Sequence, residues 1–143
     1  MDHGVPRRFL LYRRPLPPEW ESAWQVFERL ILQFVEEARR QGARFALLSV
    51  PASQVVSARA WQQLVELHPA MADVEWDVEG PERRLRELAR AHGIPLIQPY
   101  RRFQEAAKDT ALFFGPVGHM TPSGHHLMAS VLEDFVSEAT AWD

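Results

Sequence analysis

The strongest pattern in the chain is a broad apolar stripe between residues 19 and 41. Aromatic and aliphatic side chains recur there at spacings of three and four residues, which is the periodicity of an amphipathic helix. They are Trp20, Ala23, Trp24, Phe27, Leu30, Ile31, Phe34, Val35 and Ala38. Gly42 follows them and suits a helix C-cap. The stripe predicts a helix from about Glu19 to Gln41 whose aromatic face packs against a sheet.

Two short segments, residues 44–51 and 94–98, are apolar almost throughout and predict buried strands. Continuous apolar runs of this length are typical of parallel strands that are covered on both faces. Pro51 closes the first run. The second run follows Gly93, which ends a helix predicted over residues 81–92.

Apolar spacing and turn residues predict three further helices. They cover residues 57–67, residues 99–108 and the segment that begins with Thr121 as its N-cap. Residues 1–19 contain four prolines and are predicted to be an irregular N-terminal segment. A short edge strand is expected within it, at residues 8–12.

The alternation of helices and strands predicts the α/β class, as a partial three-layer α/β/α fold of the flavodoxin-like type with few parallel strands. Parallel sheets are normally covered on both faces and contain more than two strands. We therefore expect residues 20–143 to resemble the second half of a larger doubly wound domain. A missing N-terminal half, or a second copy in a homodimer, would complete it.

Composition narrows the class of protein. The chain has 143 residues, of which 46% are hydrophobic and 24% charged, the balance of a folded domain rather than a disordered one. It has no cysteine, which excludes disulfides and thiolate catalysis. The net charge is −3, and the basic cluster at residues 7–14 is interpreted as a solvated terminal segment. No nucleic-acid partner is expected.

No apolar run approaches the roughly 18 residues of a membrane span, so no transmembrane segment is predicted. Near the start, the only apolar run covers residues 9–12, which is too short for the core of a secretory signal. As written, the chain is expected in the cytoplasm.

The best candidate for chemistry is the segment Gly118–His125, at the start of the last predicted helix. A loop at the mouth of a helix presents a histidine to solvent, and a neutral imidazole accepts a proton near neutral pH. His119 holds that position. His125 and His126 are adjacent and lack a suitably spaced carboxylate, so neither a metal nor a cofactor is predicted.

Ligands of open α/β sheets bind outside the carboxyl ends of the strands. Three segments of the chain are expected to meet there: residues 49–54, 98–102 and 114–119.

The order of these pieces resembles the C-terminal half of SGNH (GDSL-like) hydrolases, including the branch linked to cell-envelope and polysaccharide O-acylation. The resemblance covers about residues 20–138. It rests on a strand that ends in Pro51, a proline-led helix with a Gly-Ile-Pro strand over residues 81–96, and the closing Gly-His-x-Thr-x-x-Gly-His at residues 118–125. It implies that His119 is the general base for a serine nucleophile, and that full-length relatives are associated with the cell envelope.

The chain lacks several residues that form the catalytic site in that family. Pro116 and Val117 stand where an aspartate would orient the histidine, and the chain contains neither Gly-Asp-Ser nor any asparagine. A triad needs a carboxylate to fix the histidine tautomer, and donors to stabilise the oxyanion. Ser53 and Ser123 lie near the expected active edge, but neither occupies a strand-to-helix elbow.

Two functions are compatible with these observations. The first is an SGNH-hydrolase-like protein that acts on ester bonds by ancestry and is inactive as an isolated, truncated chain. If it is active, it is a serine ester hydrolase or O-acyltransferase that needs a second half. The alternative is a non-catalytic α/β interaction module that self-associates or binds a partner protein. The sequence identifies no substrate-binding residue.

Overall fold

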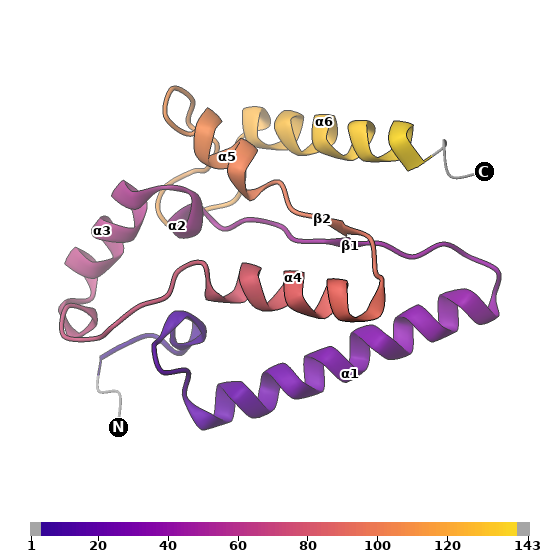
Figure 1. Cartoon of the computed structure of the whole chain (residues 1–143). Coiled ribbons are helices and arrows are strands. Elements are labelled where there is room, and N and C mark those ends of the chain that lie inside the picture. The colour runs from indigo at the N-terminus through magenta and orange to yellow at the C-terminus, as the bar shows by residue number, and fades with distance from the viewer. Residues whose placement is uncertain (1–3, 140–143) are drawn as a thin grey trace. The chain divides into compact units, whose positions relative to one another are not determined.

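The computed structural model describes residues 4–139, and most of its elements are helices (Figure 1). Helices account for 61% of the structure, and strands together with isolated β-bridges for 6%. In chain order the elements are η1 (Arg7–Tyr12), α1 (Pro18–Arg40), β1 (Leu47–Leu48), α2 (Ser53–Val56), α3 (Ala58–Leu67), η2 (Pro69–Met71), α4 (Gly80–His92), β2 (Leu96–Ile97), α5 (Tyr100–Ala106) and α6 (Pro122–Ala139). None of the described helices is long and apolar enough to cross a membrane.

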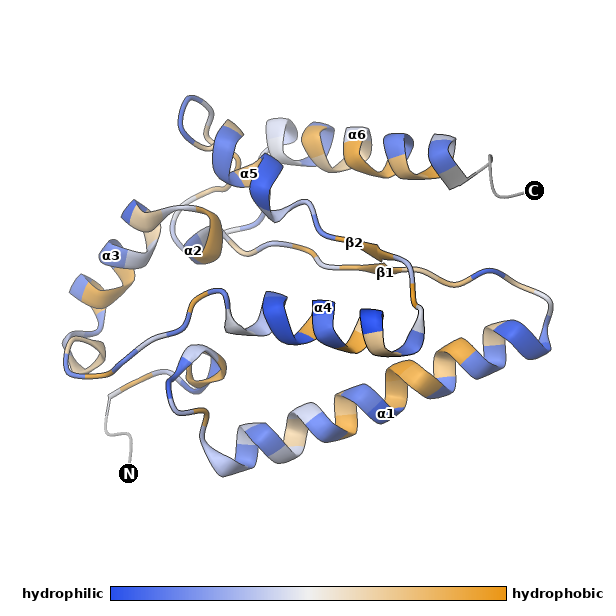
Figure 2. Ribbon diagram, in the orientation of Figure 1, coloured by the Kyte–Doolittle hydropathy of each residue, from blue (hydrophilic) through white to orange (hydrophobic). Residues whose placement is uncertain are grey.

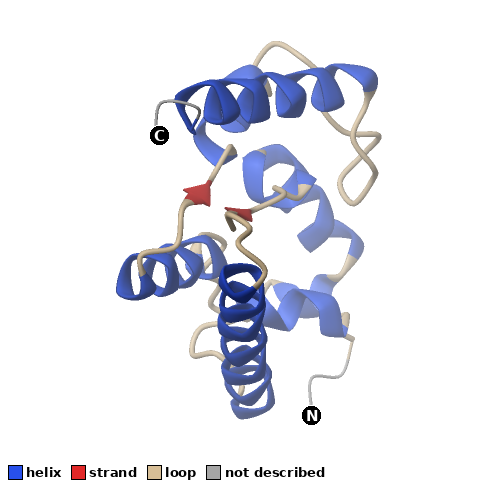
Figure 3. Cartoon of the chain, turned by 90° about the vertical axis from the view of Figure 1, so that its right-hand side faces the viewer, coloured by secondary structure: helices blue, strands red, loops and turns tan. Residues whose placement is uncertain are grey.

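The predicted three-layer α/β/α fold is wrong. Within the described residues the sheet consists of two parallel strands, β1 and β2, each two residues long (Figure 3). The backbone N–H of Leu47 donates to the carbonyl of Pro95 over 2.9 Å, and that of Ser49 donates to the carbonyl of Ile97 over 3.0 Å. A pair of this length cannot form the central layer of such a fold.

Prolines explain why the apolar runs do not become longer strands. Pro51 follows the first run, and Pro95 and Pro99 flank β2. Proline has no backbone N–H to donate to a ladder and fixes its own φ angle, so it confines strand pairing to the residues between prolines. The hydrophobic pattern located both strands but overstated their length. It also overstated the burial of the first run, since Pro51 is the only buried residue of 44–51 and Val50 is 63% exposed.

The predicted helices are confirmed, with small shifts at their ends. α1 ends at Arg40, and Gly42 beyond it has a φ of +68°. α4 ends at His92, and its C-cap Gly93 has a φ of +62°, the left-handed conformation that glycine adopts without strain. The expected edge strand at residues 8–12 is wrong, because this segment forms η1.

The described residues form two compact units, and the chain passes from one to the other within β1 and within β2. Unit 1 contains the residues up to Leu47 together with His68–Leu96. Unit 2 contains Leu48–Leu67 and the residues from Ile97 onward.

In unit 1, α1 packs on α4 along a narrow edge of its apolar stripe. Val35 forms a buried cluster with Ala89 and Ile94. Five partly buried residues pack around it: Ile31, Leu32, Phe45, Leu47 and Leu96. Three large residues of the stripe remain exposed, with exposed fractions of 39% for Phe27, 48% for Leu30 and 62% for Phe34, and the neighbouring Val26 is 47% exposed. The expectation that the whole aromatic face packs against a sheet is therefore wrong (Figure 2).

Unit 2 is built around Phe103 of α5, which is fully buried. Leu64 of α3 and Leu112 are also buried in this unit, and the rings of Phe103 and Phe113 lie 6.1 Å apart. From α6, Met128 and Val131 are buried.

We expect Phe103→Ala to lower the free energy of unfolding by about 3–5 kcal/mol, because it removes a large buried ring and leaves a cavity. Phe114→Ala is the matched control, since Phe114 belongs to the same unit and is 68% exposed. Its effect should stay within about 0.5 kcal/mol. Urea unfolding followed by circular dichroism measures both changes, and equal effects would contradict the described core.

Candidate functional site

The segment that contains His119 is a tight hairpin in unit 2. Phe113 and Met120 form an antiparallel bridge, and the N–H of Phe114 donates to the carbonyl of His119 over 2.9 Å. The N–H of Thr121 donates to the carbonyl of Leu112, also over 2.9 Å. His119 therefore lies on the returning arm of the hairpin, two residues before the N-cap of α6.

Both glycines of the motif are required by close backbone approach. A Cβ atom on Gly118 would lie 2.1 Å from the carbonyl oxygen of Phe114, and one on Gly124 would lie 2.3 Å from that of Leu112. No side chain fits at those distances. Gly118 and Gly124 are thus explained by folding, with no need for a catalytic role.

Thr121 joins the hairpin to α6. Its hydroxyl donates to the carbonyl of Ala111 over 2.7 Å and accepts the N–H of Gly124 over 3.2 Å. The second bond is the N-cap interaction predicted from sequence, because Gly124 is the third residue of the helix.

The His119 side chain is exposed, and within residues 4–139 it makes no hydrogen bond or ion pair. His125 and His126, in the first turns of α6, are also exposed. The described part of the chain contains no group of three or more histidine, aspartate or glutamate side chains that could hold a metal. The role of His119 as a general base stays a prediction.

Ser53 links two of the three segments that were expected to meet. Its side chain is buried, and its hydroxyl donates to the carbonyl of Gly115 over 2.8 Å. Ser53, Gly115 and Asp109 line a cavity of about 440 Å³ that His119 does not line. The Ser53 hydroxyl therefore holds the hairpin against α2 through this hydrogen bond. Ser123, the other serine near the expected active edge, is exposed at the start of α6.

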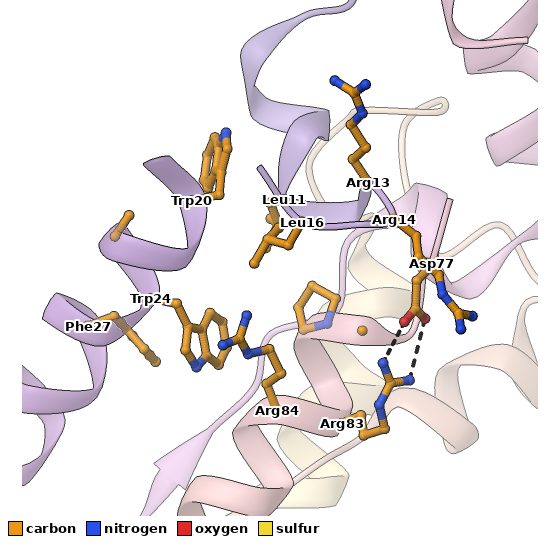
Figure 4. Close-up of a pocket in the computed structure, with 13 residues that line it drawn as sticks. Leu11, Arg13, Arg14, Leu16, Trp20, Trp24, Phe27, Asp77, Arg83 and Arg84 are labelled. Atoms are coloured by element: carbon orange, nitrogen blue, oxygen red, sulfur yellow. Dashed lines mark hydrogen bonds and ion pairs between the residues drawn. The ribbon is translucent and has the colours of Figure 1, made fainter. Parts of the chain in front are cut away.

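A larger cavity lies in unit 1, with a volume of about 760 Å³ (Figure 4). One part of its wall is apolar and comes mainly from η1, α1 and the segment between them. The other part is charged. The lining residues are Leu11, Arg13, Arg14, Leu16, Trp20, Ala23, Trp24, Phe27, Asp77, Gly80, Pro81, Arg83 and Arg84.

Short backbone pairing brings the first arginines to this cavity. The N–H of Arg14 donates to the carbonyl of Glu75 over 2.8 Å, and the N–H of Asp77 donates to the carbonyl of Tyr12 over 2.7 Å. Arg13 forms an antiparallel bridge with Trp76 between these two bonds. The segment before α1 is thus held against the segment before α4.

The second pair of arginines comes from the first turns of α4, and each is oriented by an ion pair. Arg83 binds Asp77, with its Nη2 2.5 Å from Oδ2. Arg84 binds Glu21 of α1 through both terminal nitrogens, one of them at 2.8 Å, and its guanidinium carbon lies 5.1 Å from the centre of the Trp24 ring. This cation–π contact fixes the guanidinium over the indole.

The ion pairs shift the pKa values of these groups. The hydrogen bond from Arg83, reinforced by its charge, lowers the pKa of Asp77. The hydrogen bond from Arg84 lowers the pKa of Glu21, and the same bond raises the pKa of Arg84. All of these groups are therefore charged at neutral pH.

Sequence reasoning missed this cavity. It interpreted Arg13 and Arg14 as part of a solvated terminal segment, and it assigned the tryptophans of α1 to a core beneath a sheet. The Arg-Arg pairs at residues 13–14 and 83–84 are two of five such pairs in the chain, so they gave no specific signal for the cavity.

Comparison of the chain with protein-family models, with curated proteins and with solved structures finds no match. The resemblance to SGNH hydrolases therefore gains no support from these comparisons.

We expect Gly118→Ala to destabilise the protein by about 1–3 kcal/mol, because the added methyl forces the hairpin backbone to shift. His119→Ala, at the neighbouring exposed position, should change the free energy of unfolding by less than about 0.5 kcal/mol. Urea unfolding of the two variants checks this contrast. A Gly118→Ala protein as stable as the parent would rule out the close approach described above.

The chain alone should hydrolyse p-nitrophenyl acetate no faster than buffer, because the described residues give His119 no orienting carboxylate. Release of p-nitrophenol at pH 7–8 is the measurement, with His119→Ala as the control. Turnover that is present in the parent and disappears in His119→Ala would show that the histidine acts as a base without the expected machinery.

Proposed function

We propose that this chain is a non-catalytic interaction module that associates with a second copy of itself through α1. The observation that supports the proposal is the exposed part of the α1 stripe. We call this surface the α1 seam and define it as the half-buried Trp20 together with Ala23, Phe27, Leu30 and Phe34. Of these, Phe27, Leu30 and Phe34 are large side chains that remain well exposed.

The seam has the spacing of a helix that pairs with another helix. The spacing between its members alternates between three and four residues. An aromatic residue therefore recurs every seven residues, at Trp20, Phe27 and Phe34, with Ala23 and Leu30 in between. This is the a/d pattern of a coiled coil. Val35 and Ile31 pack on the core of unit 1. The seam lies beside this contact on the same helix, so Phe27, Leu30 and Phe34 remain available to a second copy.

An antiparallel pair of α1 helices can place the ring of Phe34 opposite the small side chain of Ala23. If Phe27 lies opposite Leu30 of the second copy, the same register places Phe34 opposite Ala23 of the second copy. Each contact occurs twice by two-fold symmetry. A large ring opposite an alanine fills the space between two helices without overpacking.

Charges at the ends of α1 support the same arrangement. In this register Glu19, near the start of one helix, flanks Arg40, at the end of the other. Both side chains are exposed. Arg40 also pairs with Glu37 of its own helix, which leaves further N–H donors of the guanidinium for a second carboxylate. Antiparallel helices also align their dipoles favourably.

Ester hydrolysis is the weaker candidate for this chain. The described residues do not bring a serine hydroxyl and a carboxylate to His119, and the Ser53 hydroxyl already bonds to Gly115. Action on ester bonds stays a prediction from resemblance.

Sedimentation velocity over a series of concentrations tests the proposal. We expect the parent chain to be a dimer at micromolar concentration. Phe34→Glu should weaken the dimer by about 100-fold or more, because it places a carboxylate in an apolar contact. Phe114→Glu is the matched control, since Phe114 is equally exposed but lies in unit 2.

Charge exchange tests the orientation in the same assay. Glu19→Arg or Arg40→Glu alone should weaken the dimer by about fivefold, and the double variant should restore most of the affinity. A monomeric parent chain, or equal weakening by Phe34→Glu and Phe114→Glu, would refute the proposal.

A further inference from the structure

The cavity in unit 1 has the size and composition of a small-molecule site, a role distinct from self-association. Its volume of about 760 Å³ lies within the range of roughly 300–1,000 Å³ that ligand pockets occupy. Such pockets combine a mostly apolar wall with a few polar groups that fix the ligand's orientation. The cavity meets both conditions.

The apolar wall consists of rings and branched side chains from η1, from α1 and from the segment between them. Leu11 comes from η1, Leu16 precedes α1, and Trp20, Trp24 and Phe27 project from α1 (Figure 4). These side chains bury an apolar body favourably, at roughly 25 cal/mol per Å² of apolar surface removed from water.

The charged part of the wall is predominantly cationic. Four arginines line the cavity against a single aspartate, so the lining carries a net charge of 4 − 1 = +3. Two carboxylates outside the lining, Glu21 and Glu75, pair with Arg84 and Arg14, so part of this charge is compensated. The Arg14–Glu75 contact is long, at 3.6 Å, and both side chains are largely exposed, so it is weak.

The arginines retain hydrogen-bonding capacity toward a ligand. A guanidinium has five N–H donors in a planar fork that matches a carboxylate or phosphate. The pair with Asp77 uses the two terminal nitrogens of Arg83 through one N–H each. The remaining N–H groups can bind a second acceptor.

A cationic ligand fits this wall poorly. Aromatic faces attract cations, but the guanidinium of Arg84 already lies over the Trp24 ring, and the other arginines repel positive charge. We propose that the cavity binds an amphipathic anion, with its apolar body against Trp20, Trp24 and Leu16 and its anionic head beside Arg13 and Arg83.

Titration of the full chain with decanoate, below the concentration at which it forms micelles, tests this site. Calorimetry gives the affinity, and a change of tryptophan fluorescence that becomes smaller in Trp20→Phe and in Trp24→Phe locates the ligand. We expect decanoate to bind about tenfold more tightly than 1-decanol or decyltrimethylammonium, and acetate not to bind measurably. Decyl phosphate compares the two kinds of anionic head.

Variants separate charge recognition from nonspecific apolar binding. Arg83→Gln should weaken decanoate by about tenfold while leaving 1-decanol unchanged. Arg13→Gln is a second variant in case loss of the Asp77 pair unfolds unit 1. Arg102→Gln is the matched control, because Arg102 belongs to unit 2 and pairs with Asp134 there.

Equal affinity for decanoate and 1-decanol, or binding that neither Arg83→Gln nor Arg13→Gln weakens, would overturn the proposal. Repeating the titration in Phe34→Glu separates it from self-association, since Phe34 does not line the cavity. Anion binding that persists in this variant stands whether or not the chain dimerises.

Discussion

The packing of α1 on α4 is the contact on which unit 1 depends. It is narrow, since Val35 meets Ala89 and Ile94 along one edge of the α1 stripe. A helix of 23 residues with so broad an apolar face has more hydrophobic surface than this contact covers. The uncovered surface lies on the adjacent part of the same helix, where Phe27, Leu30 and Phe34 remain exposed. Exposed aromatic surface of this extent is characteristic of interaction sites.

The same geometry produces the cavity. Toward its N-terminus, α1 is joined to α4 by the ion pair of Glu21 with Arg84, with Arg84 stacked on Trp24. An ion pair between long side chains spans more space than a contact between small apolar residues. The space beside it is lined by tryptophan and leucine on one part of the wall and by arginine on the other. Trp20, Ala23 and Phe27 belong both to the seam and to the cavity wall, so the two proposed binding surfaces share part of one helix.

Local patterns predicted much of the secondary structure but little of the architecture. Apolar spacing with Gly42, Gly93 and Thr121 located the helices closely, because these signals act within a few residues. The strands were overestimated because an apolar run does not record backbone hydrogen bonding, and prolines interrupt the pairing. The exposure of Phe34 was unpredictable from periodicity alone, since an amphipathic face looks the same whether a sheet, a second copy or solvent lies against it.

The same limit applies to the candidate sites. The motif at residues 118–125 is well explained by backbone approach at Gly118 and Gly124 and by the Thr121 cap, which are structural roles that sequence alone does not separate from catalytic ones. The arginines at residues 13–14 and 83–84 are far apart in sequence, and pairing of residues 12–14 with 75–77 brings them to one cavity. No local pattern encodes that pairing.

Antiparallel pairing of α1 is the central claim, and distances between spin labels test it most directly. The chain has no cysteine, so single cysteines at Gln25 and Gln41, both exposed, can be labelled cleanly. With a rise of 1.5 Å per residue and the dyad between residues 28 and 29, the account predicts that the distance between the two Gln41 labels exceeds that between the Gln25 labels by about 20 Å. A distance between the Gln25 labels that equals or exceeds the distance between the Gln41 labels would indicate a parallel pair, because Gln25 lies on the helix face opposite the seam. Either that result or the absence of any intermolecular distance would contradict the account.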